Sequence, residues 1–269
     1  MLQSHVAQCM RKKRIPEATM ERMLSEIRFP AKPKLLGSSR KVEKGEKQGV
    51  LTAVLYLAPH ELSKPWGGGN VCPHATPGCI AACLGHSSGR LRLESSRNSQ
   101  VWKTLVFLHA RTVFSTMLET EIHAHVKKAK RKGLTPALRL DGTSDTALGE
   151  FWSKAFPEVQ FYDYTKSRSK ALRWAQGDMP ATYHVTFSLA ETKASRMDAD
   201  AVAAAGGNVA VVFRTRDPAE FPKKFIGLPV INGDETDIRF GDPRGCVVGL
   251  TAKGSLAPKD TTGFVQEVK

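Results

Sequence analysis

The chain has 269 residues, of which 41% are hydrophobic and 25% are charged. This composition is typical of a globular protein that buries one large core or two small ones, and no apolar run approaches membrane-spanning length. Lys and Arg number 40 against 26 Asp and Glu. The resulting net charge of +14 predicts an acidic partner, either nucleic acid or an anionic small molecule.

The first 48 residues are predicted to form a basic extension. Arg11-Lys12-Lys13-Arg14 lies near its start, and a short helix over about residues 16–28 precedes a flexible arm rich in Pro, Gly and Ser. Such an arm would contact the phosphates of a nucleic acid. Residues 49–269 are then expected to form a β/α domain.

A buried strand over residues 50–57 opens that domain, and a loop over residues 63–70 leads to three cysteines. Cys72, Cys79 and Cys83 have the spacing Cys-x6-Cys-x3-Cys. The first gap holds two prolines and a glycine and predicts a loop. The second is apolar and alanine-rich, and it predicts a helical turn with Cys79 and Cys83 on one face. Thiolates are favoured near helix N-termini, so this arrangement can hold a metal ion or an iron–sulfur cluster.

The sequence leaves the choice of metal open. A structural zinc ion takes four protein ligands, and His74 or His86 could complete a Cys3His set. A four-iron, four-sulfur (4Fe–4S) cluster fits three cysteines with one open iron. Cys246 could be a fourth ligand, although its apolar setting favours a core residue. A disulfide is the weaker alternative, because an odd count of five cysteines and a start without an apolar signal segment favour the reducing cytoplasm.

Residues 94–132 are predicted to form one long helical stretch or two, because their apolar residues recur at helical intervals. The stretch ends in the basic run Lys127-Lys128-Ala129-Lys130-Arg131-Lys132. Cations favour helix C-termini, and Gly133 is the predicted stop.

Short apolar strands alternate with helical segments after Gly133. The strands are expected at residues 136–141, 159–164, 183–188, 208–213, 228–232 and 246–250, with helices near residues 147–155, 168–176 and 195–205. This alternation indicates right-handed crossovers and a parallel sheet. We therefore predict an α/β fold with a partial or closed β/α barrel; a doubly wound open sheet is the alternative.

Polar residues follow most of these strands, and in a β/α barrel the carboxyl ends of the strands meet at one mouth. The cysteine loop follows the first strand and would open there too. The candidate catalytic residues at this mouth are Asp141, Asp145, Asp163 and Lys166. The candidate cofactor-binding residues are Asn232, Asp234 and Lys253. Lys166 and Lys253 would offer positive charge to an anionic ligand.

The sequence resembles the gene product eighty-eight family of tailed-phage proteins from about Lys41 to about Gly254. The resemblance rests on blocks of sequence at Val71-Cys72-Pro73, Pro77-Gly78-Cys79 and Cys83, at Arg139-Leu140-Asp141-Gly142-Thr143-Ser144-Asp145, at Phe161-Tyr162-Asp163-Tyr164-Thr165-Lys166 and at Val248-Gly249-Leu250-Thr251-Ala252-Lys253-Gly254.

A more distant likeness is to radical S-adenosylmethionine enzymes, which also place three cysteines after the first strand of a partial β/α barrel. Their usual spacing, Cys-x3-Cys-x2-Cys, differs from the spacing here. The likeness implies a 4Fe–4S cluster on Cys72, Cys79 and Cys83, with one iron open to the methionine end of S-adenosylmethionine. It also implies that Gly245 and Gly249 lie in a late glycine-rich strand near the adenine of that cofactor.

Three functions follow from these patterns. The first is an iron–sulfur protein with a β/α barrel that acts as a radical-type enzyme on nucleic acid or a nucleotide. The second is a zinc-stapled nucleic-acid-binding protein without catalysis. The third is a magnesium-dependent nuclease, whose metal ligands would be Asp141, Asp145, Asp163, Asp234 and Asp237. In each case we expect a cytoplasmic protein of a bacterial cell, with no membrane partner.

Overall fold

The computed structural model describes residues 1–268, and within them every side chain except those of Arg40 and Lys41. The described residues contain one nine-stranded sheet. Its strands are β1 (Leu36–Gly37), β2 (Val50–Leu55), β3 (Thr135–Arg139), β4 (Gln160–Thr165), β5 (Tyr183–Ser188), β6 (Asn208–Phe213), β7 (Lys224–Phe225), β8 (Leu228–Asn232) and β9 (Val247–Thr251).

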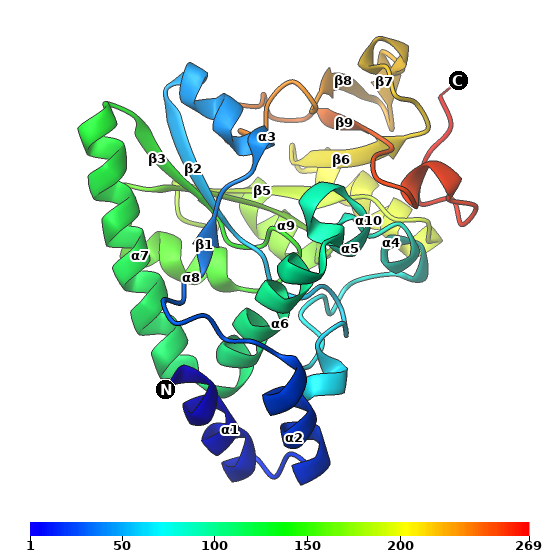
Figure 1. Ribbon diagram of the computed structural model, residues 1–269. Helices are drawn as coiled ribbons and strands as arrows, with labels where there is room; N and C mark the ends of the chain where they lie inside the picture. The colour runs from blue at the N-terminus through cyan, green and yellow to red at the C-terminus, as the bar shows by residue number, and fades with distance from the viewer. Residues whose placement is uncertain (269) are drawn as a thin grey trace.

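The helices fall mainly before and between the strands (Figure 1). They are α1 (Leu2–Lys12), α2 (Glu17–Glu26), α3 (Arg40–Glu43), α4 (Pro77–Ala81), α5 (Leu84–Ser87), α6 (Glu94–His109), α7 (Arg111–Lys132), α8 (Leu148–Ala155), α9 (Arg168–Gln176) and α10 (Lys193–Ala204). Short 3-10 helices include η1 (Lys44–Gln48) and η3 (Gly89–Arg92).

The sheet is mostly parallel and open. Strands β2 to β6 lie side by side in chain order, followed by β9, β8 and β7. The neighbours from β2 to β8 pair in parallel, whereas β1 and β7 run antiparallel at the two edges. The predicted α/β class and parallel sheet are therefore confirmed. No pairing joins the two edge strands within residues 1–268, so the closed form of the predicted barrel is wrong.

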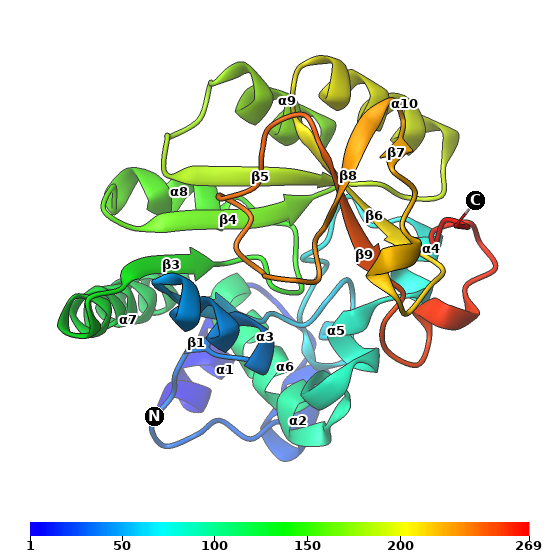
Figure 2. The same ribbon diagram turned by 90° about the horizontal axis from the view of Figure 1, so that it is seen from above.

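The helices that follow β2 to β5 pack against the strands they connect. Helix α7 contacts β2 and β3, α8 and α9 contact β4 and β5, and α10 contacts β5 and β6. Right-handed crossovers that advance in one direction place their helices on one face of a sheet, as the chain order of these strands requires. Figure 2 shows α9 and α10 above β5 in the view and α3, α5 and α6 below β3.

The two faces of the sheet differ in polarity because successive strand residues point to opposite sides. Phe161, Val185 and Val209 belong to the apolar face beneath the helices. On the opposite face, Tyr164, Thr186 and Asn208 stand next to one another on neighbouring strands. Residues 233–246, between β8 and β9, fold over this polar face; Phe240 packs 5.8 Å from the Tyr162 ring, and the fully buried Arg239 pairs with Asp242 at 3.1 Å.

The first 48 residues pack into the same core as the sheet. Met10 of α1 and Met20 and Met23 of α2 are buried in the cluster that includes α6 and α7. Asn98 of α6 holds both backbone groups of Arg28, and the Glu121 carboxylate accepts the N–H groups of Leu35 and Leu36 at 2.8 Å. The helix predicted near residues 16–28 is present as α2. In the segment after α2, which was expected to be a flexible arm, Glu121 holds the backbone of Leu35 and Leu36 against the core.

The predicted helical stretch over residues 94–132 is two helices. The chain bends at Ala110, which ends α6 and precedes α7 in a non-helical conformation. Helix α7 ends at Gly133, whose φ of 66° is left-handed and favours glycine. Its basic C-terminal run therefore ends where the sequence predicted.

Candidate functional site

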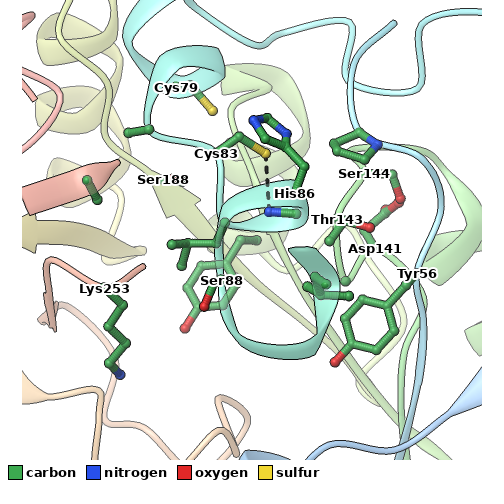
Figure 3. A pocket seen from close by; sticks show the side chains of 18 of the residues that line it. Tyr56, Cys79, Cys83, His86, Ser88, Asp141, Thr143, Ser144, Ser188 and Lys253 are labelled. Atoms are coloured by element: carbon green, nitrogen blue, oxygen red, sulfur yellow. Dashed lines mark hydrogen bonds between the residues drawn. The ribbon is translucent and has the colours of Figure 1, made fainter. Parts of the chain in front are cut away.

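A cavity of about 1220 Å³ opens at the carboxyl ends of the parallel strands. It is lined by residues that follow β2, β3, β4 and β9, among them Tyr56, Asp141, Lys166 and Lys253. The cysteine loop supplies Cys72, Cys79 and Cys83 to the same cavity. Figure 3 shows Cys79, Cys83 and His86 on the cysteine-loop side and Asp141, Thr143 and Ser144 across from them. The structure thus brings together the three thiols and most of the predicted strand-end residues.

The cysteine loop contains two short helices instead of one helical turn. Thr76 caps α4, and its hydroxyl accepts the N–H of Cys79 at 3.3 Å. Helix α4 ends at Ala81, and Cys83 caps the next helix, α5, with its sulfur accepting the N–H of Gly85 at 3.3 Å. The prediction that Cys79 and Cys83 share one helical face is therefore wrong, because the Cys83 sulfur itself begins a new helix. Both thiols still line the cavity.

Glu191, just beyond β5, fixes the start of α4. Its carboxylate accepts the Thr76 hydroxyl at 2.7 Å and the Gly78 N–H at 2.9 Å. Burial opposes ionisation here, but these hydrogen bonds hold the pKa of Glu191 below its usual value. A Cβ at Gly78 would lie 2.7 Å from the Glu191 carboxylate and closer still to Thr262. The loop that carries Cys79 is therefore clamped between the end of β5 and the C-terminal segment.

The environment of the three thiols disfavours bare thiolates. Burial raises the pKa of Cys72 to about 12, and it also raises the pKa values of Cys79 and Cys83. Backbone donors partly offset this effect: the His60 N–H lies 3.2 Å from the Cys72 sulfur, and the Gly85 N–H contacts Cys83. Within residues 1–268, no group of three or more His, Cys, Asp or Glu side chains is gathered around a single metal-ion position.

Lys166 reaches from the end of β4 toward the cysteine loop. Its ammonium donates to the Ser188 hydroxyl at 2.9 Å, to the Ser188 carbonyl at 3.1 Å and to the Leu189 carbonyl at 3.4 Å. Burial lowers the pKa of Lys166, while the nearby Cys79 and Asp145 act in the opposite direction. Lys166 also lowers the pKa of Cys79 against the larger effect of burial. A cation thus stands beside the second thiol of the loop.

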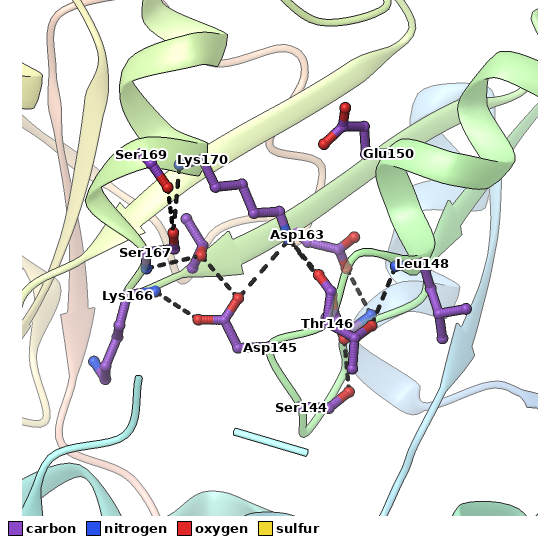
Figure 4. A network of polar contacts seen from close by, with 12 residues as sticks. Ser144, Asp145, Thr146, Leu148, Glu150, Asp163, Lys166, Ser167, Ser169 and Lys170 are labelled. Carbon is purple, nitrogen blue, oxygen red and sulfur yellow. Dashed lines mark hydrogen bonds and ion pairs between the residues drawn. The ribbon is translucent and has the colours of Figure 1, made fainter. Parts of the chain in front are cut away.

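Three predicted catalytic aspartates form a hydrogen-bonded network beside the cavity (Figure 4). Asp141 accepts the hydroxyls of Ser144 and Thr146, and Asp145 accepts the Thr165 hydroxyl at 2.8 Å and the Lys166 N–H at 2.8 Å. Lys170 lies 3.6 Å from Asp141 and 3.8 Å from Asp145. Asp141 and Asp145 still line the cavity, but they share one buried cation and several donors.

Asp163 lies away from the cavity. It is fully buried under α8, where it accepts the Asp141 N–H at 2.7 Å and the Tyr183 hydroxyl at 3.3 Å. Burial, with the nearby Asp141 charge, raises the pKa of Asp163 to about 8. Asp163 therefore holds the backbone at Asp141 in place from the helix-covered side of the sheet.

The predicted cofactor-binding residues divide into two groups. Asp234 and Lys253 line the cavity and form an ion pair with each other. Asn232 is exposed, and its side chain caps the following turn. Gly245 precedes β9 at the amino end of the strand, and a Cβ at Gly249 would meet Phe221 at 2.8 Å. Asn232, Gly245 and Gly249 are therefore not part of the cavity lining.

The additional ligands considered for a metal are also divided. His86 lines the cavity, whereas His74 is exposed and does not. Cys246 is fully buried against Ala210 and Val248, and its thiol donates to the Pro243 carbonyl at 3.2 Å. Cys246 is thus a core residue, as its apolar sequence context predicted.

Several cavity residues were not candidates in the sequence. Arg139 and Tyr164 line the floor, with the Arg139 guanidinium 4.8 Å from the centre of the Tyr164 ring and 3.3 Å from Asp237. They alternate with core residues in β3 and β4, so the period-two pattern could have found them. Arg90 and Arg92 of η3 line the mouth, and their irregular segment carries no pattern that reveals its position.

A family model described as Gene product 88 matches residues 33–268. The chain belongs to this family. No curated protein and no solved structure matches the chain. The match covers the cysteine loop and all strands of the sheet, so the cavity lies in the part of the chain that defines family membership. In the described part of the chain, no helix has the length and apolar character needed to cross a membrane.

Proposed function

We propose that this Gene product 88 protein is an iron–sulfur enzyme in which Cys72, Cys79 and Cys83 hold a 4Fe–4S cluster beside the cavity. One observation carries the proposal: three thiols of a single loop line one cavity at the carboxyl ends of parallel strands. The strands from β2 to β6 follow chain order, which supports describing the sheet as a partial β/α barrel.

The surroundings of the sulfurs fit such a cluster. Backbone N–H groups contact Cys72 and Cys83, and hydrogen bonds to sulfur are one means by which a protein sets the potential of an iron–sulfur centre. Burial disfavours the free thiolates, and metal ligation supplies the compensating positive charge. A zinc ion needs every sulfur ligand at about 2.3 Å from one centre. A cluster gives each thiolate its own iron and constrains their mutual distance less.

The cavity supports a small anionic substrate, such as a nucleotide. Arg90 and Arg92 line its mouth, and neither guanidinium group forms a hydrogen bond or ion pair with another side chain of residues 1–268. Lys166 and Lys253 contribute less, because carbonyls hold the first and Asp234 neutralises the second. A bound cluster would supply an electron at low potential, while these side chains would hold the substrate next to it. S-adenosylmethionine is a candidate second ligand on the strength of the cysteine loop, which follows β2.

The test is anaerobic purification followed by iron, sulfide and zinc analysis. We expect a brown protein that absorbs broadly near ~400 nm and contains iron and sulfide. Cys72→Ser, Cys79→Ser and Cys83→Ser should each lose most of the iron, while Cys9→Ser, outside the cavity, should retain it. Stoichiometric zinc without iron would overturn the proposal, and so would a full iron content in the three cavity variants. Calorimetric titration with S-adenosylmethionine, with and without the cluster, tests the second ligand separately.

A further inference from the structure

A strongly basic surface lies where α7 ends, at the amino ends of β2 and β3. Seven exposed cations form this basic face: Lys44, Lys47, Lys127, Lys128, Lys130, Arg131 and Lys132. An ion pair of 2.7 Å between Lys132 and Glu46 joins α7 to η1, so the two segments that carry these cations are neighbours, and Glu46 partly neutralises Lys132. We propose that this basic face binds the phosphate backbone of nucleic acid.

Local helix energetics account for only part of this charge. The helix dipole favours cations within the last turn by about 0.3–1 kcal/mol each, which covers Lys130, Arg131 and Lys132. Lys127 and Lys128 lie one turn earlier, where they stand four residues from Arg131 and Lys132. Like charges at this spacing are destabilising by about 0.2–0.5 kcal/mol per pair. The cluster therefore carries an electrostatic cost in the free protein, and a polyanion bound over it would remove that cost.

The shape of the basic face suits a polymer of phosphates better than a single small anion. Lys127 and Arg131 are separated by about 6 Å along the helix axis, at about 1.5 Å per residue, and Lys44 and Lys47 widen the face beyond the helix. One nucleic acid strand presents a charge about every 3.4 Å along its axis. Several cations can thus contact successive phosphates of one strand. No enclosed pocket is needed for such contacts.

The position of the basic face separates it from the cavity. Helix α7 ends at Lys132 and β3 begins at Thr135, so the basic face is at the amino ends of the strands, whereas the cavity is at their carboxyl ends. The expected contact site was the basic extension over the first 48 residues, of which Lys44 and Lys47 are also part. There Arg11 pairs with Glu17, and Lys13 donates to the Leu108 carbonyl. The inference is independent of the metal at the cysteines.

The experiment measures binding of the full chain to a short fluorescein-labelled DNA duplex, and to the matching DNA and RNA single strands, by fluorescence anisotropy over a salt series. We expect the affinity to fall steeply between about 50 and about 200 mM salt. The variant Lys127→Gln/Lys128→Gln/Lys130→Gln/Arg131→Gln should bind at least about tenfold more weakly, and each lost phosphate contact should lower the salt slope by about one.

Matched variants separate this face from a general charge effect. Lys127→Gln/Arg131→Gln should weaken binding more than Lys223→Gln/Lys224→Gln, which removes two exposed charges at β7 on the far edge of the sheet, or Lys12→Gln/Arg14→Gln, which tests the N-terminal run. Equal losses in these doubles would overturn the proposal. Binding that ignores salt would do so too, as would binding to phosphatidylserine vesicles without binding to nucleic acid. Circular dichroism and a metal content equal to that of the wild type check that the variants retain the fold and the cysteine site.

Discussion

At the scale of single residues, buried charges beside the cavity are balanced in small groups. The Lys170 ammonium pairs with both Asp141 and Asp145, and it also donates to the Thr146 carbonyl at 2.9 Å. Removing one member of a buried ionic group leaves an uncompensated charge and typically costs about 3–5 kcal/mol. These residues therefore hold the strand ends in place whatever chemistry occurs in the cavity, and loss of activity in their variants must be compared with loss of stability.

Asp163 gives a pH-dependent prediction. Its pKa is raised from 3.8 to about 8 by burial, so the unfolded chain ionises at lower pH than the folded one. Its contribution to the free energy of unfolding is fully present below about pH 4. As the pH rises to about 8 this contribution is lost progressively, by at most about 1.4 kcal/mol per pH unit. Asp163→Asn should flatten this decline in urea unfolding measured across the range. The exposed Asp200→Asn should keep the wild-type slope; equal slopes in all three proteins would contradict the assignment.

At the scale of elements, the cysteine loop depends on an anchor far away in the sequence. Glu191 accepts two hydrogen bonds at the start of α4, and hydrogen bonds to a charged group contribute about 1.5–3 kcal/mol each. Glu191→Ala should lower the free energy of unfolding by about 1–3 kcal/mol and increase the rate at which Cys79 reacts with a thiol reagent. Glu191→Gln keeps one carbonyl acceptor, so its stability and its Cys79 reaction rate should lie between those of the wild type and those of Glu191→Ala. A Cys79 reaction rate that is the same in Glu191→Ala as in the wild type would show that α4 is held by other contacts.

The elements also show what the sequence could predict. Strands β2 to β6, β8 and β9 agree with the sequence prediction within one or two residues, because runs such as Asn208–Phe213 are short, apolar and bounded by Gly or polar residues. Strand order and the two edge strands were not predicted, since pairing between distant segments leaves no local pattern. The break between α4 and α5 was missed because the Cys83 sulfur acts as a cap, a role that serine or aspartate usually fills.

The candidate site was predictable only in outline. Strand ends that carry Asp141, Asp145 and Lys166 pointed to a common mouth, and the structure gathers them there. The sequence could not reveal that Asp163 points to the helix side of the sheet, because a one-residue change of register reverses the face. Nor could it reveal Glu191 as the anchor of α4, since that contact spans more than a hundred residues.

At the scale of the whole molecule, the first two helices are part of one cooperative core. Val6, Met10, Met20, Met23 and Ile27 are all nearly inaccessible to solvent, and each such side chain contributes about 1.5–3 kcal/mol of burial free energy. A chain that lacks residues 1–27 should therefore unfold at a much lower temperature or fail to fold, as followed by circular dichroism. Met10→Ala and Met23→Ala should each cost about 2–5 kcal/mol, whereas the exposed Lys12→Gln should change stability by less than about 0.5 kcal/mol. A truncated chain with an unchanged unfolding temperature would contradict this view.

The two short edge strands have a consequence for how copies of this protein meet. An open sheet normally offers its unpaired edge as a template on which another chain can add a strand. Here β1 and β7 each span only two residues and run against their neighbours, and Lys223 and Lys224 place exposed charge at the β7 edge. A second copy would find too few backbone groups at either edge for a stable ladder, and two like charges at the β7 edge. We therefore expect the open sheet to resist strand addition between copies of this protein.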